Sequence, residues 1–290
     1  MKLIIALVLF PAFCFSQPLG EIITKDQAEQ LITDKFKIVG YKYDSFAIDS
    51  PSPIFDTFGK ADLDHDGEED LLVFGTAYVT VDGTAYEEDE IVIILGDKKS
   101  PTKVSFPYSF FRGLGVHIIP YPKIIKFDSQ DYLLIQYDLT DYENGTSKTY
   151  KDTLFVAYDH IMPYNNAPGN KVVTRIEFKT DYCFGSCPVF EISMDKNLDA
   201  TYNGIDHVSK KGEYNLKASK RDWGYLSQLI ALLNVDRLKD SYYVNWTDDQ
   251  TAYLTVYFQD GSKKQIEDYG LTGTFGLSVL YDYFFGLREF

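Results

Sequence analysis

The chain has 290 residues, of which 45% are hydrophobic and 16% aromatic, and its formal net charge is −15. The hydrophobic content excludes a globally disordered chain, and the length fits two ordinary domains better than one. The acidic balance argues against nucleic acid or anionic lipid as a partner. Abundant Tyr and Phe suit half-buried strands, so the composition favours a mainly β fold.

The first residues have the pattern of a secretory signal peptide, which we predict over residues 1–16 with cleavage near Ser16/Gln17. A positively charged start is followed by a short apolar core that is too short to span a bilayer. Phe13 stands before Cys14 where a lipoprotein needs a small residue, so a lipid anchor is disfavoured. We therefore expect a secreted or periplasmic protein without a transmembrane segment.

Residues 17–161 are predicted to form an antiparallel β-rich domain that opens with a short helix. Thr24 and Gln27 have the spacing of a capping box, and the helix should end near Lys35. Asp82-Gly83 is a strong hairpin signal. Strand-like segments follow one another over 71–81, 91–95, 123–127, 132–138 and 154–158.

Two groups of acids in this domain are expected in loops. The run 87–90 is interpreted as a solvated cluster at a hairpin end, in preference to a metal site. Asp138, Asp141 and Glu143 are interpreted in the same way.

An acidic loop precedes the first of these strands, with the spacing D-x-D-x-D-G-x-x-D. Its members are Asp62, Asp64, Asp66, Gly67 and Asp70. Ca²⁺ prefers six to eight oxygen ligands, and alternate residues of a tight loop can point their carboxylates inward. The backbone carbonyl of Glu68 is a further candidate ligand. An EF-hand is excluded because Val73 stands where that motif has its last Glu.

This loop, which leads directly into a strand, resembles the calcium loops of FG-GAP/VCBS repeats. The resemblance implies that the four aspartates ligate Ca²⁺, which is the one cofactor we predict. Such repeats build β-propellers from many copies, whereas one copy is found here, so a propeller is not expected. The other interpretation of the loop is a solvated acidic turn.

Residues 162–170 are rich in Pro, Asn and Gly and are predicted to be a linker. Residues 171–290 should form an α+β domain, in which an antiparallel sheet packs against two helices. Its strands are expected at 172–179, 189–194, 200–204, 252–258 and 263–269. Its amphipathic helices are expected after Ser219 and over 277–284.

Cys183 and Cys187 flank a Phe-Gly-Ser turn and precede Pro188. Cysteines at this spacing can reach disulfide geometry, and an exported compartment favours oxidation. Because the closed loop is so small, the bond would pin a turn more than it would stabilise the fold. Two alternatives to the disulfide stay open. In the first, the two cysteines are reduced or unpaired. In the second, the pair serves redox or copper chemistry, since C-x₃-C-P is similar to segments of copper-delivery proteins that hold Cu(I) through thiolates.

The cysteine motif and three later segments resemble a secreted bacterial domain of unknown function, DUF 6438. The later segments are Glu191-Ile192-Ser193, Tyr202-Asn203-Gly204 and Asp268-Tyr269-Gly270. The resemblance implies an exported or envelope domain and supplies no activity.

No hydrolase, nucleotide or metalloprotease motif is present, which weighs against an enzyme without deciding the question. Cys187 with His207 as a nucleophile and base, or an unrecognised pair of acids, are the catalytic alternatives. We predict an exported, non-catalytic calcium-binding protein with a binding or structural role at the cell envelope. Its partner would be a protein or a carbohydrate, since exposed Tyr can stack on sugars. The alternative function is thiol redox or Cu(I) handling through Cys183 and Cys187.

Overall fold

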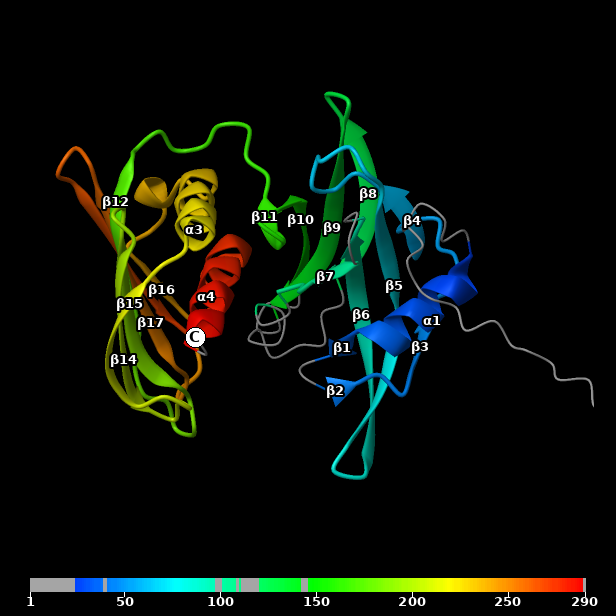
Figure 1. The fold of residues 1–290 in the computed structure, drawn as a ribbon, viewed down its shortest axis with the longest axis horizontal. Helices are drawn as coiled ribbons and strands as arrows, with labels where there is room; N and C mark the ends of the chain where they lie inside the picture. The colour runs from blue at the N-terminus through cyan, green and yellow to red at the C-terminus, as the bar shows by residue number, and fades with distance from the viewer. Residues whose placement is uncertain are drawn as a thin grey trace, which may run out of the picture.

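The computed structural model describes residues 24–38, 41–96, 101–107, 110, 120–141 and 146–288. The predicted signal peptide and its cleavage site lie outside these residues. Figure 1 shows a layered arrangement of three larger sheets and the helices α1, α3 and α4. Across the molecule, the layers are a seven-stranded sheet, α3 with α4, a four-stranded sheet, a five-stranded sheet and α1 (Figure 1).

A long antiparallel hairpin, β5 (Asp70–Val81) and β6 (Thr84–Leu95), forms the centre of the five-stranded sheet. Its turn is Asp82-Gly83, as predicted, and both residues have positive φ, which suits the twist of a two-residue hairpin. The other strands of this sheet are β3 (Ser45–Ile48), β4 (Phe58–Ala61) and β7 (Thr102–Val104). The short strands β1 (Lys37–Ile38) and β2 (Tyr41–Lys42) pair separately.

Both faces of the hairpin are buried in the half away from its turn, which explains the continuous apolar runs there. Leu72 and Phe74 face the core shared with the four-stranded sheet, whereas Leu71 and Val73 belong to a second core. The helix α1 (Lys25–Lys35) covers that second core with Ala28, Leu31 and Ile32. Its predicted capping box between Thr24 and Gln27 is confirmed.

The acidic run 87–90 lies within β6 and not at a hairpin end, so the predicted place is wrong, although residues 87–89 are exposed as expected of a solvated cluster. The Asp82-Gly83 turn sets a register that pairs these residues with Gly75–Tyr78 of β5. Glu90 is buried, and it accepts hydrogen bonds from Lys103 Nζ at 2.6 Å and from Tyr43 Oη at 2.6 Å. Glu90 therefore lies in the strand, where it forms an ion pair with Lys103 and a hydrogen bond with Tyr43.

The four-stranded sheet is an antiparallel meander in the order β8-β9-β10-β11. Its strands are β8 (Tyr121–Phe127), β9 (Gln130–Asp141), β10 (Thr146–Ala157) and β11 (His160–Pro163). The central strands are longer than predicted, since β9 continues to Asp141 and β10 begins at Thr146. Asp138 lies inside β9 opposite Thr149 and not in a loop. Asp141 is the last residue of β9, and Glu143 lies outside the described residues.

The C-terminal sheet has the strand order β15-β14-β13-β12-β17-β18-β16. The five predicted strands are present as β12 (Val173–Thr180), β13 (Val189–Asp195), β14 (Asp199–Asp206), β17 (Thr251–Phe258) and β18 (Lys263–Tyr269). The sequence missed the two edge strands, β15 (Gly212–Lys217) and β16 (Ser241–Tyr243). The sheet is antiparallel as predicted, except that β16 runs parallel to β18.

The two predicted helices, α3 (Lys220–Leu232) and α4 (Phe275–Leu287), pack on one face of this sheet (Figure 1). A 3₁₀ turn, η2 (Val235–Arg237), follows α3. The rings of Phe178 and Phe284 stack with centroids 4.7 Å apart, which joins sheet to helix. The fold class, mainly β with an α+β C-terminal part, is therefore confirmed.

The N-terminal sheets meet the C-terminal helices at β11. Tyr225 of α3 donates to the carbonyl of Ile161, and Phe275 of α4 contacts the rings of Phe106 and Phe110. One hydrophobic cluster contains residues of both halves. Within the predicted linker, Met162 and Pro163 belong to β11, and the division of the chain at 162–170 stays a prediction.

Candidate functional site

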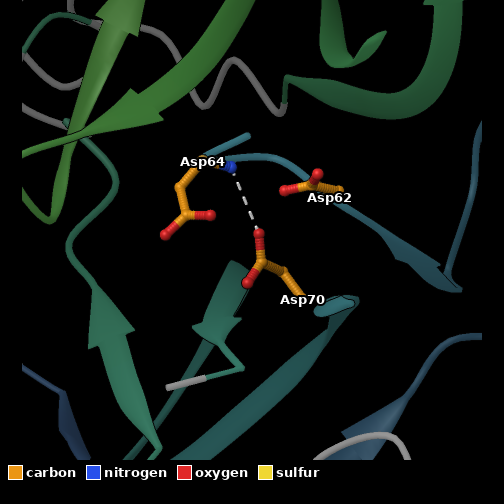
Figure 2. A group of neighbouring side chains, drawn as sticks. All are labelled: Asp62, Asp64 and Asp70. Carbon is orange, nitrogen blue, oxygen red and sulfur yellow. Dashed lines mark hydrogen bonds between the residues drawn. The ribbon is translucent and has the colours of Figure 1, made fainter. Parts of the chain in front are cut away.

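The acidic loop connects β4 to β5 and brings three carboxylates together. One oxygen from each of Asp62, Asp64 and Asp70 lies within 4.8 Å of the others. Figure 2 shows the three side chains converging on one space. Among the described residues, this is the one group of three or more acidic, histidine or cysteine side chains so arranged.

Asp70, the first residue of β5, forms the base of the group and is only 1% exposed. Its Oδ2 accepts the backbone N–H groups of Leu63 at 2.8 Å and Asp64 at 3.3 Å, and its Oδ1 accepts that of Gly96 at 2.9 Å (Figure 2 shows the bond to Asp64). Burial raises the pKa of Asp70 to about 6, although these hydrogen bonds oppose the rise. The loop therefore holds a carboxyl group in place at a cost in electrostatic energy.

Backbone donors inside the loop also hold Asp62. Its Oδ1 accepts the N–H of Asp66 at 3.0 Å, and its Oδ2 accepts the N–H of Gly67 at 3.1 Å. Gly67 has a φ of 94°, a backbone conformation that is strained for residues with a side chain and that glycine adopts freely. This conformation explains why the motif has glycine at this bend.

Negative charge accumulates around Asp64. Burial raises its pKa most, followed by the charge of Asp66, and Asp62 and Asp159 act in the same direction. Among the residues that the structure describes, the three carboxylates of Asp62, Asp64 and Asp70 have no Lys or Arg as an ion-pair partner.

The remaining predicted ligands lie at the edge of the loop. Asp66 is exposed and does not belong to the group of three, and its Oδ1 accepts the N–H of Glu68 at 2.8 Å. Glu68 is also exposed. The structure therefore brings together three of the four aspartates that the motif singles out.

Sequence reasoning missed two residues that anchor the loop. Gly96, directly after β6, approaches so closely that an added Cβ would lie 2.5 Å from the carbonyl oxygen of Glu69. His65 Nε2 lies 2.8 Å from the carbonyl oxygen of Asp131, and its ring stacks on Phe155. Neither residue carried a local signal, because its partner lies far away in the chain.

The predicted cysteine pair, Cys183 and Cys187, forms a disulfide with Cα atoms 5.8 Å apart. The bonded pair lies between β12 and β13. Thr180 Oγ1 donates to the carbonyl of Pro188 at 2.7 Å, which fixes the ends of the turn. His207 lies 3.6 Å from the carboxylate of Asp206.

A shallow pocket of about 340 Å³ lies at the β16 edge of the C-terminal sheet. Its walls are formed by Lys239, Ser241, Tyr242, Tyr243, Thr272 and Gly273. No acid lines it, so this pocket does not supply the paired carboxylates of a glycosidase-like site. None of the described helices is long and apolar enough to cross a membrane.

Comparison with known proteins supports the resemblance of the C-terminal half. Residues 174–288 match the family described as "Domain of unknown function (DUF6438)". No curated protein and no solved structure matches the chain. The β12–β18 sheet with α3 and α4 therefore corresponds to the part of the chain that matches this family, while the calcium-loop resemblance of the N-terminal half stays a prediction.

Proposed function

We propose that this is an exported, non-catalytic protein whose acidic loop holds a structural Ca²⁺ ion. The observation that carries the proposal is the convergence of Asp62, Asp64 and Asp70 without a Lys or Arg partner among the described residues. Three carboxylates offer hard oxygen ligands of the kind Ca²⁺ prefers, and backbone carbonyls or water would complete the six to eight. Burial raises the pKa of Asp64 most, and a bound cation would also offset the repulsion from Asp66 and Asp62 that adds to this rise.

The position of the loop suggests what the ion would stabilise. The loop is hydrogen-bonded to Gly96, directly after β6, through Asp70. It is also hydrogen-bonded to the start of β9, where Asp131 Oδ2 accepts the N–H of Asp62 at 3.2 Å. It therefore connects the five-stranded and four-stranded sheets. A cation at this place would lock the two sheets together and so maintain the surfaces that bind a partner at the cell envelope.

Calorimetric titration and thermal melting test the calcium site directly. We expect Ca²⁺ to raise the melting temperature, because a ligand at a hundred times its Kd adds about 2.7 kcal/mol to the free energy of unfolding. Asp64→Asn should remove most of this response. Glu69→Gln is the matched control, since it removes one charge from the same loop at a residue whose carboxylate pairs with Lys60 at 3.8 Å.

The proposal is overturned if the unmodified protein and Asp64→Asn melt alike with Ca²⁺ and with chelator. Asp66→Asn adds a finer comparison. The sequence motif counts Asp66 as an equal ligand, whereas its carboxylate lies outside the group of three. We therefore expect Asp66→Asn to lower the affinity for Ca²⁺ less than Asp64→Asn does.

A further inference from the structure

Four exposed aromatic rings lie at one end of the C-terminal sheet, two on the loop that follows β12 and two on the end of β16 and the loop that follows it. The exposed fractions are 88% for Phe184, 82% for Tyr243, 56% for Tyr182 and 40% for Trp246. We call these four residues the aromatic edge. Exposed rings that gather in one place mark an interaction surface more often than scattered ones do.

Hydrogen bonds hold the two loops together. Phe184 donates its backbone N–H to the carbonyl of Asp248 at 3.1 Å, and Gln250 Nε2 donates to the carbonyls of Asp181 at 2.9 Å and Pro188 at 2.7 Å. Trp246 is held in turn, since its Nε1 donates to Asp249 at 3.0 Å. The aromatic edge is therefore one surface on fixed backbone.

The Cys183–Cys187 disulfide encloses Phe184, the most exposed of the four rings. A bond across so short a turn removes conformational freedom from the residues inside it. The turn therefore loses less conformational entropy when a partner binds, and this smaller loss increases the affinity. The cysteine motif thus has a use beyond stability, which is to present an aromatic side chain in a fixed position.

The two segments that carry these four rings are negatively charged. Residues 181–188 and 243–250 contain Asp181, Asp248 and Asp249 and no Lys or Arg. Elsewhere on the same sheet, half-buried rings have Lys or Arg side chains of the chain itself over their faces. Lys179 Nζ lies 4.5 Å from the ring centroid of Tyr253, for example. Within the described residues, the aromatic edge has no such cation and no ring partner.

We propose that the aromatic edge docks a basic, Arg- or Lys-bearing segment of a partner protein. Guanidinium and ammonium groups are attracted to the faces of Trp, Tyr and Phe, and Trp, Tyr and Arg dominate the binding energy of protein interfaces. The three aspartates add charge complementarity, which a neutral sugar would leave unused. This inference is independent of the calcium site.

Fluorescence anisotropy with a labelled hexa-arginine peptide tests the inference on the intact protein, with hexaglutamate and chitohexaose as comparison ligands. We expect the peptide to bind, and hexaglutamate not to bind. Phe184→Ser with Trp246→Ala should weaken peptide binding by about tenfold or more, as loss of interface anchors does. Both side chains are exposed, so the variant should melt like the unmodified protein.

Two further pairs of variants separate docking from general charge attraction. Asp181→Asn with Asp248→Asn should weaken binding severalfold, whereas Glu87→Gln with Glu88→Gln, which removes two charges from β6, should not. Cys183→Ser with Cys187→Ser should also weaken binding while the protein stays folded, because Phe184 is no longer pinned.

The proposal is overturned if the ring variant binds the peptide as tightly as the unmodified protein does, or if the β6 charge variant loses as much affinity as the Asp181 and Asp248 variant. Ring-dependent binding of chitohexaose in the absence of peptide binding would also overturn it. That outcome would assign the surface to a glycan instead.

Discussion

The carboxylate of Asp70 accepts the backbone N–H of Gly96 at 2.9 Å, so the end of the acidic loop is bonded to the residue that follows β6. This bond needs a close approach of two backbones. The loop is consequently held by a residue that lies 26 positions away in the chain, and not only by its own turns.

Replacement of Gly96 by Ala should damage the loop. The added Cβ would lie 2.5 Å from the carbonyl oxygen of Glu69, so backbone must move and the hydrogen bond to Asp70 lengthens. We expect the free energy of unfolding to fall by about 1–3 kcal/mol and the affinity for Ca²⁺ to fall with it. Urea denaturation and calcium titration measure the two effects.

Gly286→Ala is the control, because its added Cβ meets nothing within 4 Å and alanine suits a helix better than glycine. If Gly96→Ala is as stable as the unmodified protein and binds Ca²⁺ equally well, the close approach has no energetic role.

The sequence predicted the local features of this protein well. The capping box at Thr24, the turn at Asp82-Gly83 and the face of α4 each depend on neighbouring residues, and all are present. The three converging aspartates were also within reach, since they lie in a single loop of nine residues whose turns depend on Gly67.

What the sequence missed depends on contacts between distant residues. Glu90 was interpreted as solvated, yet it is buried beside Lys103 of β7 and Tyr43, which lies between β2 and β3. The short edge strand β16 exists only because β18 pairs with it in parallel, and three residues carry no periodic signal. No local pattern reveals such partners.

The disulfide should contribute little to stability. A turn of this size removes only about 2 kcal/mol of chain entropy from the unfolded state. We therefore expect Cys183→Ser with Cys187→Ser to remain folded, with a loss of at most that amount in urea denaturation. A complete loss of the folded state would mean that the bond organises the whole domain.

Thiol titration of the unmodified protein decides between the structural disulfide and the alternative of redox or Cu(I) chemistry. The structure shows both sulfurs bonded to each other, so neither is a thiolate that can hold a metal. We expect the pair to resist glutathione. Ready reduction followed by Cu(I) binding would instead favour the alternative function.

Asp268 is a buried acid that should lower stability at neutral pH. It is fully buried, and its Oδ1 and the nearby Tyr281 hydroxyl have no hydrogen-bond partner among the described residues, although Oδ2 accepts the N–H of Gly273 at 3.0 Å. Burial raises the pKa of Asp268. A raised carboxyl pKa means that its stabilising contribution exists at low pH and is lost as the pH rises through the folded value.

Asp268→Asn should consequently stabilise the protein at pH 7.5, by about 1–3 kcal/mol, and the gain should shrink toward pH 4. Urea denaturation at the two pH values measures this difference. A variant that is less stable than the unmodified protein at pH 7.5 would show that the charged form is needed in the fold.

His160 lies where the two halves of the chain meet, and it should make that contact sensitive to acid. Its ring centroid is 4.8 Å from that of Tyr225 and 4.9 Å from that of Tyr283. Burial lowers the pKa of His160 and the charge of Arg221 lowers it further, although Asp159 and Asp222 oppose the shift. The fold therefore favours the neutral imidazole.

Because the folded pKa is below the unfolded value of about 6.5, the unfolded chain binds the proton more readily. The stabilising contribution is complete above that value and is lost as the pH falls, with a slope of at most about 1.4 kcal/mol per pH unit. His160→Phe should flatten the slope of unfolding free energy between pH 6.5 and 5.5 in chelator. Tyr283→Phe, which removes only the hydroxyl that donates to Asp222 at 2.7 Å, should keep it. Equal slopes in His160→Phe and the unmodified protein would place the acid sensitivity elsewhere.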